Sequence, residues 1–286
     1  MPASGALPCC SNNEDKGQTM TIRAPAVAGR FYQASPLGLR KQIQQWFAEP
    51  CDAELMPRAL IVPHAGYMFS GEVAAKAFRW LKKAHSQYRK VILIGPSHHY
   101  VFDGCALPAD QYFATPLGDV KIDLQGVEKL SHLNDIELSD HIHELEHCLE
   151  VQLPFLQSCL SAFTLLPVLT SRIAPSRLAE IIDPLWQDDT LLVISSDLSH
   201  YHPYADAQDI DHRTLTVIET FDPSLTPQQA CGSTGINTLL LLAKQRGYFL
   251  TQIEYKNSGD TEAGDKERVV GYVSYLVSAT TQTGPE

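Results

Sequence analysis

The chain has 286 residues, of which 44% are hydrophobic and 19% charged, a composition typical of a soluble globular protein. Its formal net charge of −11 and the lack of a Lys/Arg-rich patch argue against a nucleic-acid partner. No apolar run approaches the roughly 18 residues that a membrane span requires, so we predict no membrane association.

The seven cysteines indicate a reducing compartment. They form no Cys-x-x-Cys pair and no repeating spacing, and their odd number does not suit a disulfide framework. Cys9 and Cys10 stand in a polar tail with no signal-peptide core before them. We therefore predict a cytoplasmic protein, with a disordered tail over residues 1–21 and one folded domain over residues 22–280.

Predicted helices and strands alternate along the folded part of the chain. The first helix covers residues 35–49 and has Ser35 as its N-cap. The segments expected after it are a strand (59–67), a helix entered from Ser70 (70–84), a strand (91–99), a mainly helical stretch (145–160) kinked or broken at Pro154, a strand (163–170), a helix (175–187), a strand (190–200), two helices (204–221 and 231–247) and two final strands (248–256 and 268–278). This alternation predicts an α/β fold with a mostly parallel central sheet flanked by helices.

Three of the apolar strands end in side chains that can bind metals or move protons. The first ends at His64, the second at His98 and His99, and the third at Asp197 and His200. In open α/β sheets, ligands bind beyond the carboxyl ends of the strands, so these side chains are expected to meet. Imidazole is the commonest metal ligand, which predicts a metal-binding cluster. The alternative is that each histidine is an ordinary hydrogen-bonded group.

Cys231 precedes the predicted helix over 231–247. Free N–H groups and the helix dipole at such a position lower the pKa of a thiol, so a thiolate there could bind a metal or act as a nucleophile. The alternative is a small buried hydrophobic residue, which is the interpretation we keep for Cys105, Cys148 and Cys159.

Residues 143–147 match the His-Glu-x-x-His pattern of zinc metalloproteases. On a helix, His143 and His147 would bind zinc and Glu144 would act as general base. The segment lies where a helix begins, and no third ligand of the usual kind follows soon after it. A zinc protease is therefore a further alternative.

Several motifs in the chain resemble those of the Memo family, whose bacterial members are called AmmeMemoRadiSam system protein B. The motifs are APAVAGRFYQAS (24–35), PHAGY (63–67), GPSHH (95–99), EHCLEVQLPF (146–155), SSDLSHY (195–201) and the Cys-Gly turn at Cys231. The resemblance implies the fold of the catalytic subunit of class III extradiol dioxygenases, which use non-haem iron(II) held by two histidines and a glutamate. By motif, His64 and His98 match the histidine ligands, and Cys231 takes the place of the acidic ligand.

The same resemblance implies roles for the surrounding residues. Asp197, His200, Glu146 and His147 are expected in the cleft as acid/base groups or as supports for the ligands. Three further residues are expected to contact a substrate: Tyr67, Phe69 and His99. For the two aromatic residues the alternative is core packing, and His99 is expected on the face opposite to His98.

Besides the zinc protease, which is the least favoured alternative, two functional classes remain open at this point. The first is a redox enzyme with iron(II), for which the thiolate makes copper or zinc an alternative. The second is a binding module that holds a peptide or carries a metal in the same cleft. The family resemblance also implies radical-SAM and AMMECR-type proteins as partners.

Overall fold

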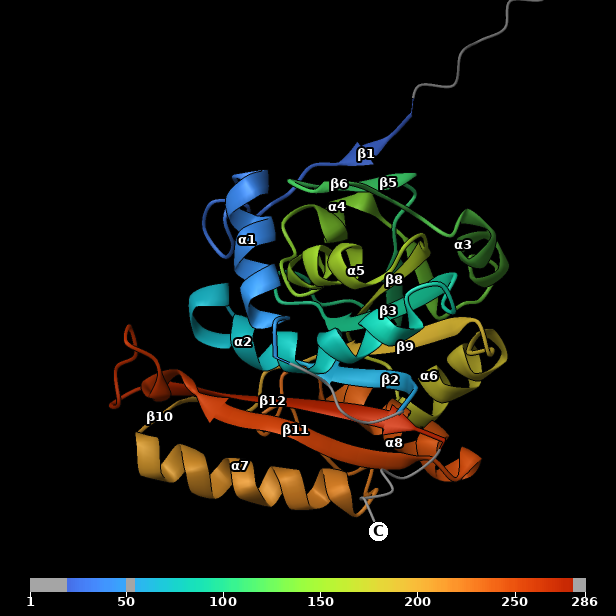
Figure 1. Cartoon of the computed structure of the whole chain (residues 1–286). Helices are drawn as coiled ribbons and strands as arrows, with labels where there is room; N and C mark the ends of the chain where they lie inside the picture. Colours follow the sequence, from blue (N-terminus) through green and yellow to red (C-terminus); the bar gives the residue numbers. More distant parts are fainter. Residues whose placement is uncertain (1–19, 50–54, 280–286) are drawn as a thin grey trace, which may run out of the picture.

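The structure is a computed structural model that describes residues 20–49 and 55–279 (Figure 1). The predicted disordered tail, apart from its last two residues, lies outside this part, as do Cys9, Cys10 and Cys51. Within these described ranges, no helix combines the length and the apolar character needed to cross a bilayer.

Nine strands of the described residues form the central sheet, in the order β10–β12–β2–β9–β3–β8–β4–β7, and β11 also pairs with β12. Four neighbouring strands at its centre run parallel: β2 (Pro57–Val62), β9 (Thr190–Ser195), β3 (Lys90–Pro96) and β8 (Thr164–Thr170). Antiparallel pairs add β12 (Val269–Ser278), β11 (Phe249–Asn257), β10 (His200–His202) and β4 (Cys105–Leu107), and β7 (Ile136–Leu138) runs parallel to β4. The predicted α/β class, single domain and mostly parallel sheet are confirmed.

Helices cover the sheet on both sides. Figure 1 shows α1 (Pro36–Trp46) and α5 (Leu153–Cys159) above the sheet and α7 (Tyr204–Glu219) below it. The helix α2 (Tyr67–Phe78) packs on β2, β11 and β12, and α8 (Ser233–Arg246) packs on β3, β9 and α6 (Pro175–Ile182). Because both faces are covered, every residue of β2 and β9 is buried, which explains the apolar runs 59–62 and 191–194 within them.

The remaining elements are short. A three-stranded sheet contains β1 (Ile22–Arg23), β5 (Tyr112–Thr115) and β6 (Gly118–Lys121). Two small helices are α3 (Leu124–Leu130) and α4 (Asp140–Glu144), and four 3-10 turns are η1 (Arg79–Ala84), η2 (Glu150–Gln152), η3 (Asp183–Leu185) and η4 (Ser258–Asp260). The strands β4 to β7 have three or four residues each, too few for a periodic pattern, so they were not predicted.

Two boundaries differ from the prediction in ways that matter for the site. The strand expected over 59–67 ends at Val62, and the next helix begins at Tyr67 instead of Ser70, whose hydroxyl donates to the carbonyl of Ala65. The stretch expected to be mainly helical over 145–160, with a kink or break at Pro154, is helical only from Glu150, where the 3-10 turn η2 leads into α5. This proline lies in the first turn of α5, where a missing N–H costs no helical hydrogen bond.

Candidate metal centre

The carboxyl ends of β2, β3 and β9 meet at one edge of the sheet. Val62 pairs with Ser195, and Ile94 pairs with Ile194, so the three strands end almost level. The chain continues from these ends into His64, His98 and Asp197 respectively. The strand-end rule therefore accounts for the meeting of three groups that lie far apart in the sequence.

His64 is completely buried and held from two sides. Its backbone N–H donates to Oδ1 of Asp197 at 2.7 Å, and its Nδ1 lies 2.9 Å from the Ser195 hydroxyl. Burial, reinforced by the neighbouring His98, keeps the pKa of His64 well below its usual range. The imidazole is therefore neutral at physiological pH, which is the form that binds metals.

His98 is held by the buried carboxylate of Glu146. The backbone N–H of His98 donates to Oε2 at 2.7 Å, and its Nδ1 lies 2.8 Å from Oε1. Oε1 also accepts the backbone N–H groups of His147 and Cys148. Burial alone would raise the pKa of Glu146, but its contacts with His98 outweigh burial and hold the pKa well below the usual range. This ionised carboxylate can only accept, so Nδ1 of His98 carries a proton and donates it.

Cys231 completes the group from the turn before α8. Its Sγ lies 3.2 Å from Nε2 of His64, and the adjacent N–H of Gly232 donates to the Ser196 hydroxyl. Burial, followed by the charge of Asp197, raises the pKa of the Cys231 thiol to about 12. The lowered thiol pKa expected from the helix start was therefore wrong, because burial outweighs the dipole. The free thiol keeps its proton until a cation displaces it.

Donor atoms of His64, His98 and Cys231 all lie within 4.8 Å of one another. Nitrogen and sulfur ligands stand about 2.0–2.3 Å from zinc, so donors sharing one ion lie roughly 3.5 Å apart. Small side-chain movements would bring the three atoms to that spacing. Two imidazoles and a thiol suit iron, copper or zinc, and the donor set therefore fits a transition metal.

A second group of possible ligands shares one histidine with the first. Donor atoms of His98, Glu146 and His147 also lie within 4.8 Å of one another. Both oxygens of Glu146, however, already accept N–H groups from the surrounding backbone and from Nδ1 of His98. This group is better described as the support of His98 than as a separate metal site.

His64 and His98 line a cleft of about 690 Å³, whereas Cys231, which contacts His64, is not among its lining residues. Of the predicted residues, His64, His98, His147, Asp197, His200 and Phe69 line it. Burial raises the pKa of Asp197, although the N–H of His64 works in the opposite direction. Burial, together with the neighbouring His64, lowers the pKa of His147 to about 4, so this ring is also neutral near pH 7. A neutral imidazole and a carboxyl group with a raised pKa thus stand beside the donors.

Four predicted residues do not line this cleft, and one of them is Cys231. Tyr67 is buried in the core, where its hydroxyl donates to the carbonyl of Val151 and its ring stacks on Phe155 at 4.7 Å. His99 is exposed, as its position next to His98 on the opposite face implies. Glu146 lies behind His98 and takes a supporting role. Cys105, Cys148 and Cys159 are buried, as expected.

The His-Glu-x-x-His pattern does not form a zinc site. The helix α4 ends at Glu144, so His143 and His147 do not share one helical face. His143 is buried, and its Nε2 donates to the carbonyl of Ala106 at 3.0 Å. Burial lowers the pKa of His143 to about 3, which keeps it as a neutral core residue. The zinc protease alternative is therefore wrong.

Sequence reasoning missed the residues that hold these ligands in place. Buried Arg23 forms an ion pair with Glu150 at 2.9 Å and donates to the carbonyls of His143 and Glu146. The Ser195 hydroxyl contacts Nδ1 of His64, and Gln152 in turn donates to that hydroxyl. None of these residues has a local sequence signal, because each partner lies far away in the chain.

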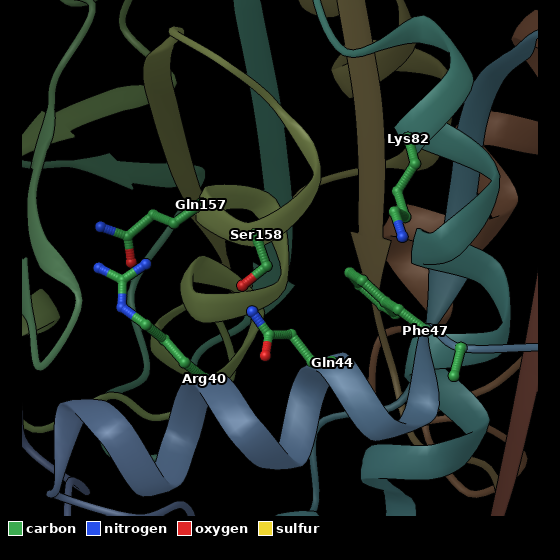
Figure 2. Close-up of a pocket in the computed structure, with 7 residues that line it drawn as sticks. Arg40, Gln44, Phe47, Lys82, Gln157 and Ser158 are labelled. Atoms are coloured by element: carbon green, nitrogen blue, oxygen red, sulfur yellow. The ribbon is translucent and has the colours of Figure 1, made fainter.

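A second pocket of about 440 Å³ lies apart from the metal centre, between α1, α5 and η1. Figure 2 shows its lining, which includes the cations Arg40 and Lys82 and no carboxylate. None of the predicted site residues lies there.

Comparison with known proteins agrees with the motifs. A family model described as "Memo-like protein" matches residues 23–276. The chain belongs to the Memo family. The four motifs from PHAGY to SSDLSHY all lie inside the matched Memo region.

The match to curated relatives covers almost the whole length of each of them. A MEMO1 family protein from Sulfolobus acidocaldarius is 34% identical over 280 residues, covering 88% of this chain and 98% of the relative. MEMO1 family proteins from Pyrobaculum aerophilum and Aquifex aeolicus are 32% and 31% identical, each covering 90% of this chain and 99% of the relative. The Memo resemblance is thus confirmed for nearly the whole folded chain.

Proposed function

We propose that the cleft binds a transition metal through His64, His98 and Cys231 and supports redox chemistry on a molecule held beside it. Iron(II) is the ion we expect, and copper or zinc is the alternative. The observation that carries the proposal is that donor atoms of His64, His98 and Cys231 lie within 4.8 Å of one another, beside the 690 Å³ cleft that both histidines line.

A metal bound there would supply Lewis acidity and electron transfer at positions left open to the cleft. The chain itself supplies the surroundings. Asp197 and His200 line the same cleft and can hold or move a proton beside the donors. His147, kept neutral by burial, can accept a proton at its free ring nitrogen. Phe31 packs against His147 at 4.9 Å and limits the access of water from that side.

A non-enzymatic module is the second candidate, in which the cleft holds a peptide or carries a metal. It is favoured by the rim, where Tyr201 is 63% exposed and the Arg268 guanidinium lies 5.0 Å above its ring. An exposed aromatic ring beside a cation is suited to a protein ligand. Association with radical-SAM and AMMECR-type proteins is part of the same proposal and rests on the family resemblance alone.

Metal content after anaerobic purification tests the assignment. We expect about one metal ion per chain in the wild type and its loss in His98→Ala and Cys231→Ser. Matched controls are His141→Ala, an exposed histidine, and Cys159→Ala, a buried cysteine outside the site. His143→Ala is also expected to keep the metal, provided that circular dichroism shows a folded protein. Retention of metal in His98→Ala and Cys231→Ser with loss in His143→Ala would refute the assignment.

Dioxygen consumption separates the two candidates once the metal is identified. Uptake of dioxygen with catechols by the wild type, abolished in Cys231→Ser, would support the enzyme. A loaded protein that binds peptides or transfers its metal without consuming dioxygen would support the module.

A further inference from the structure

The Ser195 hydroxyl stands behind His64 at the end of β9 and is completely buried. It has three polar neighbours: the carbonyl of Cys148 at 2.7 Å, Nε2 of Gln152 at 3.0 Å and Nδ1 of His64 at 2.9 Å. A serine hydroxyl has one proton and two lone pairs, so three partners saturate it. The directions of these three hydrogen bonds can therefore be assigned one by one.

The Cys148 carbonyl only accepts, so it takes the single proton of Ser195. Gln152 is oriented by a second contact, in which its Nε2 donates to the carbonyl of Pro63 at 2.9 Å. Turning this amide round would place its oxygen against that carbonyl. The second N–H of Gln152 therefore points to Ser195 and occupies one lone pair.

Only one lone pair of Ser195 is left for His64. Ser195 has no proton to give to the ring, so Nδ1 of His64 must carry the proton and donate it. We propose that Ser195, oriented by Gln152 and the Cys148 carbonyl, is a positioning residue that fixes His64 in the Nδ1–H tautomer. The Nε2 lone pair then faces Cys231, 3.2 Å away, where a metal would bind.

The tautomer decides whether the ring can act as a ligand in place. The nitrogen that binds a metal is set by the hydrogen bond that the other nitrogen makes. With the proton on Nε2, the ring would turn an N–H toward the cation site. Without the Ser195 hydroxyl, Nδ1 of His64 loses the acceptor that holds its proton, which favours that unsuitable tautomer.

Nitrogen NMR of metal-free protein labelled with ¹⁵N-histidine tests this directly, and His64→Gln identifies the signals of His64. We expect wild-type His64 to show a protonated Nδ1 and an unprotonated Nε2, and Ser195→Ala to shift the population toward Nε2–H. The matched control is Ser274→Ala, which removes a buried β12 hydroxyl that has no hydrogen-bond partner among the described residues. It should leave the His64 signals unchanged.

Competition titration then measures the consequence for metal affinity. We expect Ser195→Ala to weaken binding roughly 10–100-fold, as loss of a group behind a metal ligand usually does, and Ser274→Ala to have no effect. A wild-type His64 protonated at Nε2, or an unchanged tautomer in Ser195→Ala, would overturn the positioning role. The affinity part rests on the proposed function, but the tautomer part does not. A wild type with Nδ1–H that takes up no metal would refute the proposed function alone.

Discussion

His98 and His64 present the same ring nitrogen to the cleft, yet the groups behind them differ in charge. The carboxylate of Glu146 supports His98, whereas the hydroxyl of Ser195 supports His64. Asp197 explains the difference, because its Oδ2 already lies 3.9 Å from Nε2 of His64. A second buried carboxylate there would add repulsion and a desolvation cost. The comparison teaches that one tautomer can be held by a charged or a neutral acceptor, depending on the charges already present.

The largest expected effect comes from removing the charge behind His98. In Glu146→Gln, an NH₂ group replaces one oxygen and faces backbone N–H donors. We expect the unfolding free energy of the metal-free protein to fall by roughly 2–4 kcal/mol, because buried donors lose their acceptor. Denaturant titration measures it.

Glu144→Gln is the matched control for this change. The Glu144 side chain is 67% exposed and pairs only loosely with His141 at 3.6 Å. Its replacement should change stability by less than about 0.5 kcal/mol. Equal losses in the two variants would show that Glu146 is not a special support.

The second effect is a difference in acid sensitivity between the support of His98, which is Glu146, and the support of His64, which is Ser195. Although burial opposes it, contact with His98 lowers the pKa of Glu146 from 4.5, so below that pH the unfolded chain binds a proton that the folded protein does not. The stability that Glu146 contributes is therefore present above pH 4.5 and is lost as the pH falls toward the folded pKa. This group adds up to about 1.4 kcal/mol per pH unit to the slope.

Unfolding free energies measured between pH 5 and pH 3 check this. The contribution should vanish in Glu146→Gln and persist in Ser195→Ala, because a serine hydroxyl does not titrate. An unchanged slope in Glu146→Gln would contradict the charged support.

The smallest expected effect is the release of a single proton when the metal binds. The pKa of Cys231 is raised to about 12 by burial and then by Asp197, so its thiol is protonated before a metal binds. The pKa of His64 lies well below its usual range, so this ring has no proton to lose at pH 8, and metal loading should release about one proton, from the thiol. Calorimetry in two buffers of different ionisation enthalpy counts it. Release of two or more protons would contradict the assignment of the released proton to the thiol alone.

Much of the site could be predicted because its ligands follow buried strands. Unbroken apolar runs identified β2, β3 and β9, and the strand-end rule brought His64, His98 and Asp197 together. The ligand role of Cys231 came from the family resemblance.

The supports of the ligands could not be predicted from local patterns. Ser195 looks like any polar end of a strand, and Gln152 like any residue of a helix. Their roles depend on the register between β2 and β9 and on the segment that contains Cys148 and Gln152, which lie 47 and 43 residues before Ser195. The raised pKa of the Cys231 thiol and the burial of His143 could not be predicted either, because burial is a property of the whole fold.

The Arg23–Glu150 ion pair has a consequence for the order of folding. It joins residues 127 positions apart, and the same guanidinium holds the turn that carries Glu146. Closing so long a loop is slow compared with forming local helices, so we expect the cleft to be completed late. In stopped-flow refolding, metal uptake should lag behind the gain of secondary structure. Simultaneous appearance would show that the cleft forms without this long-range contact.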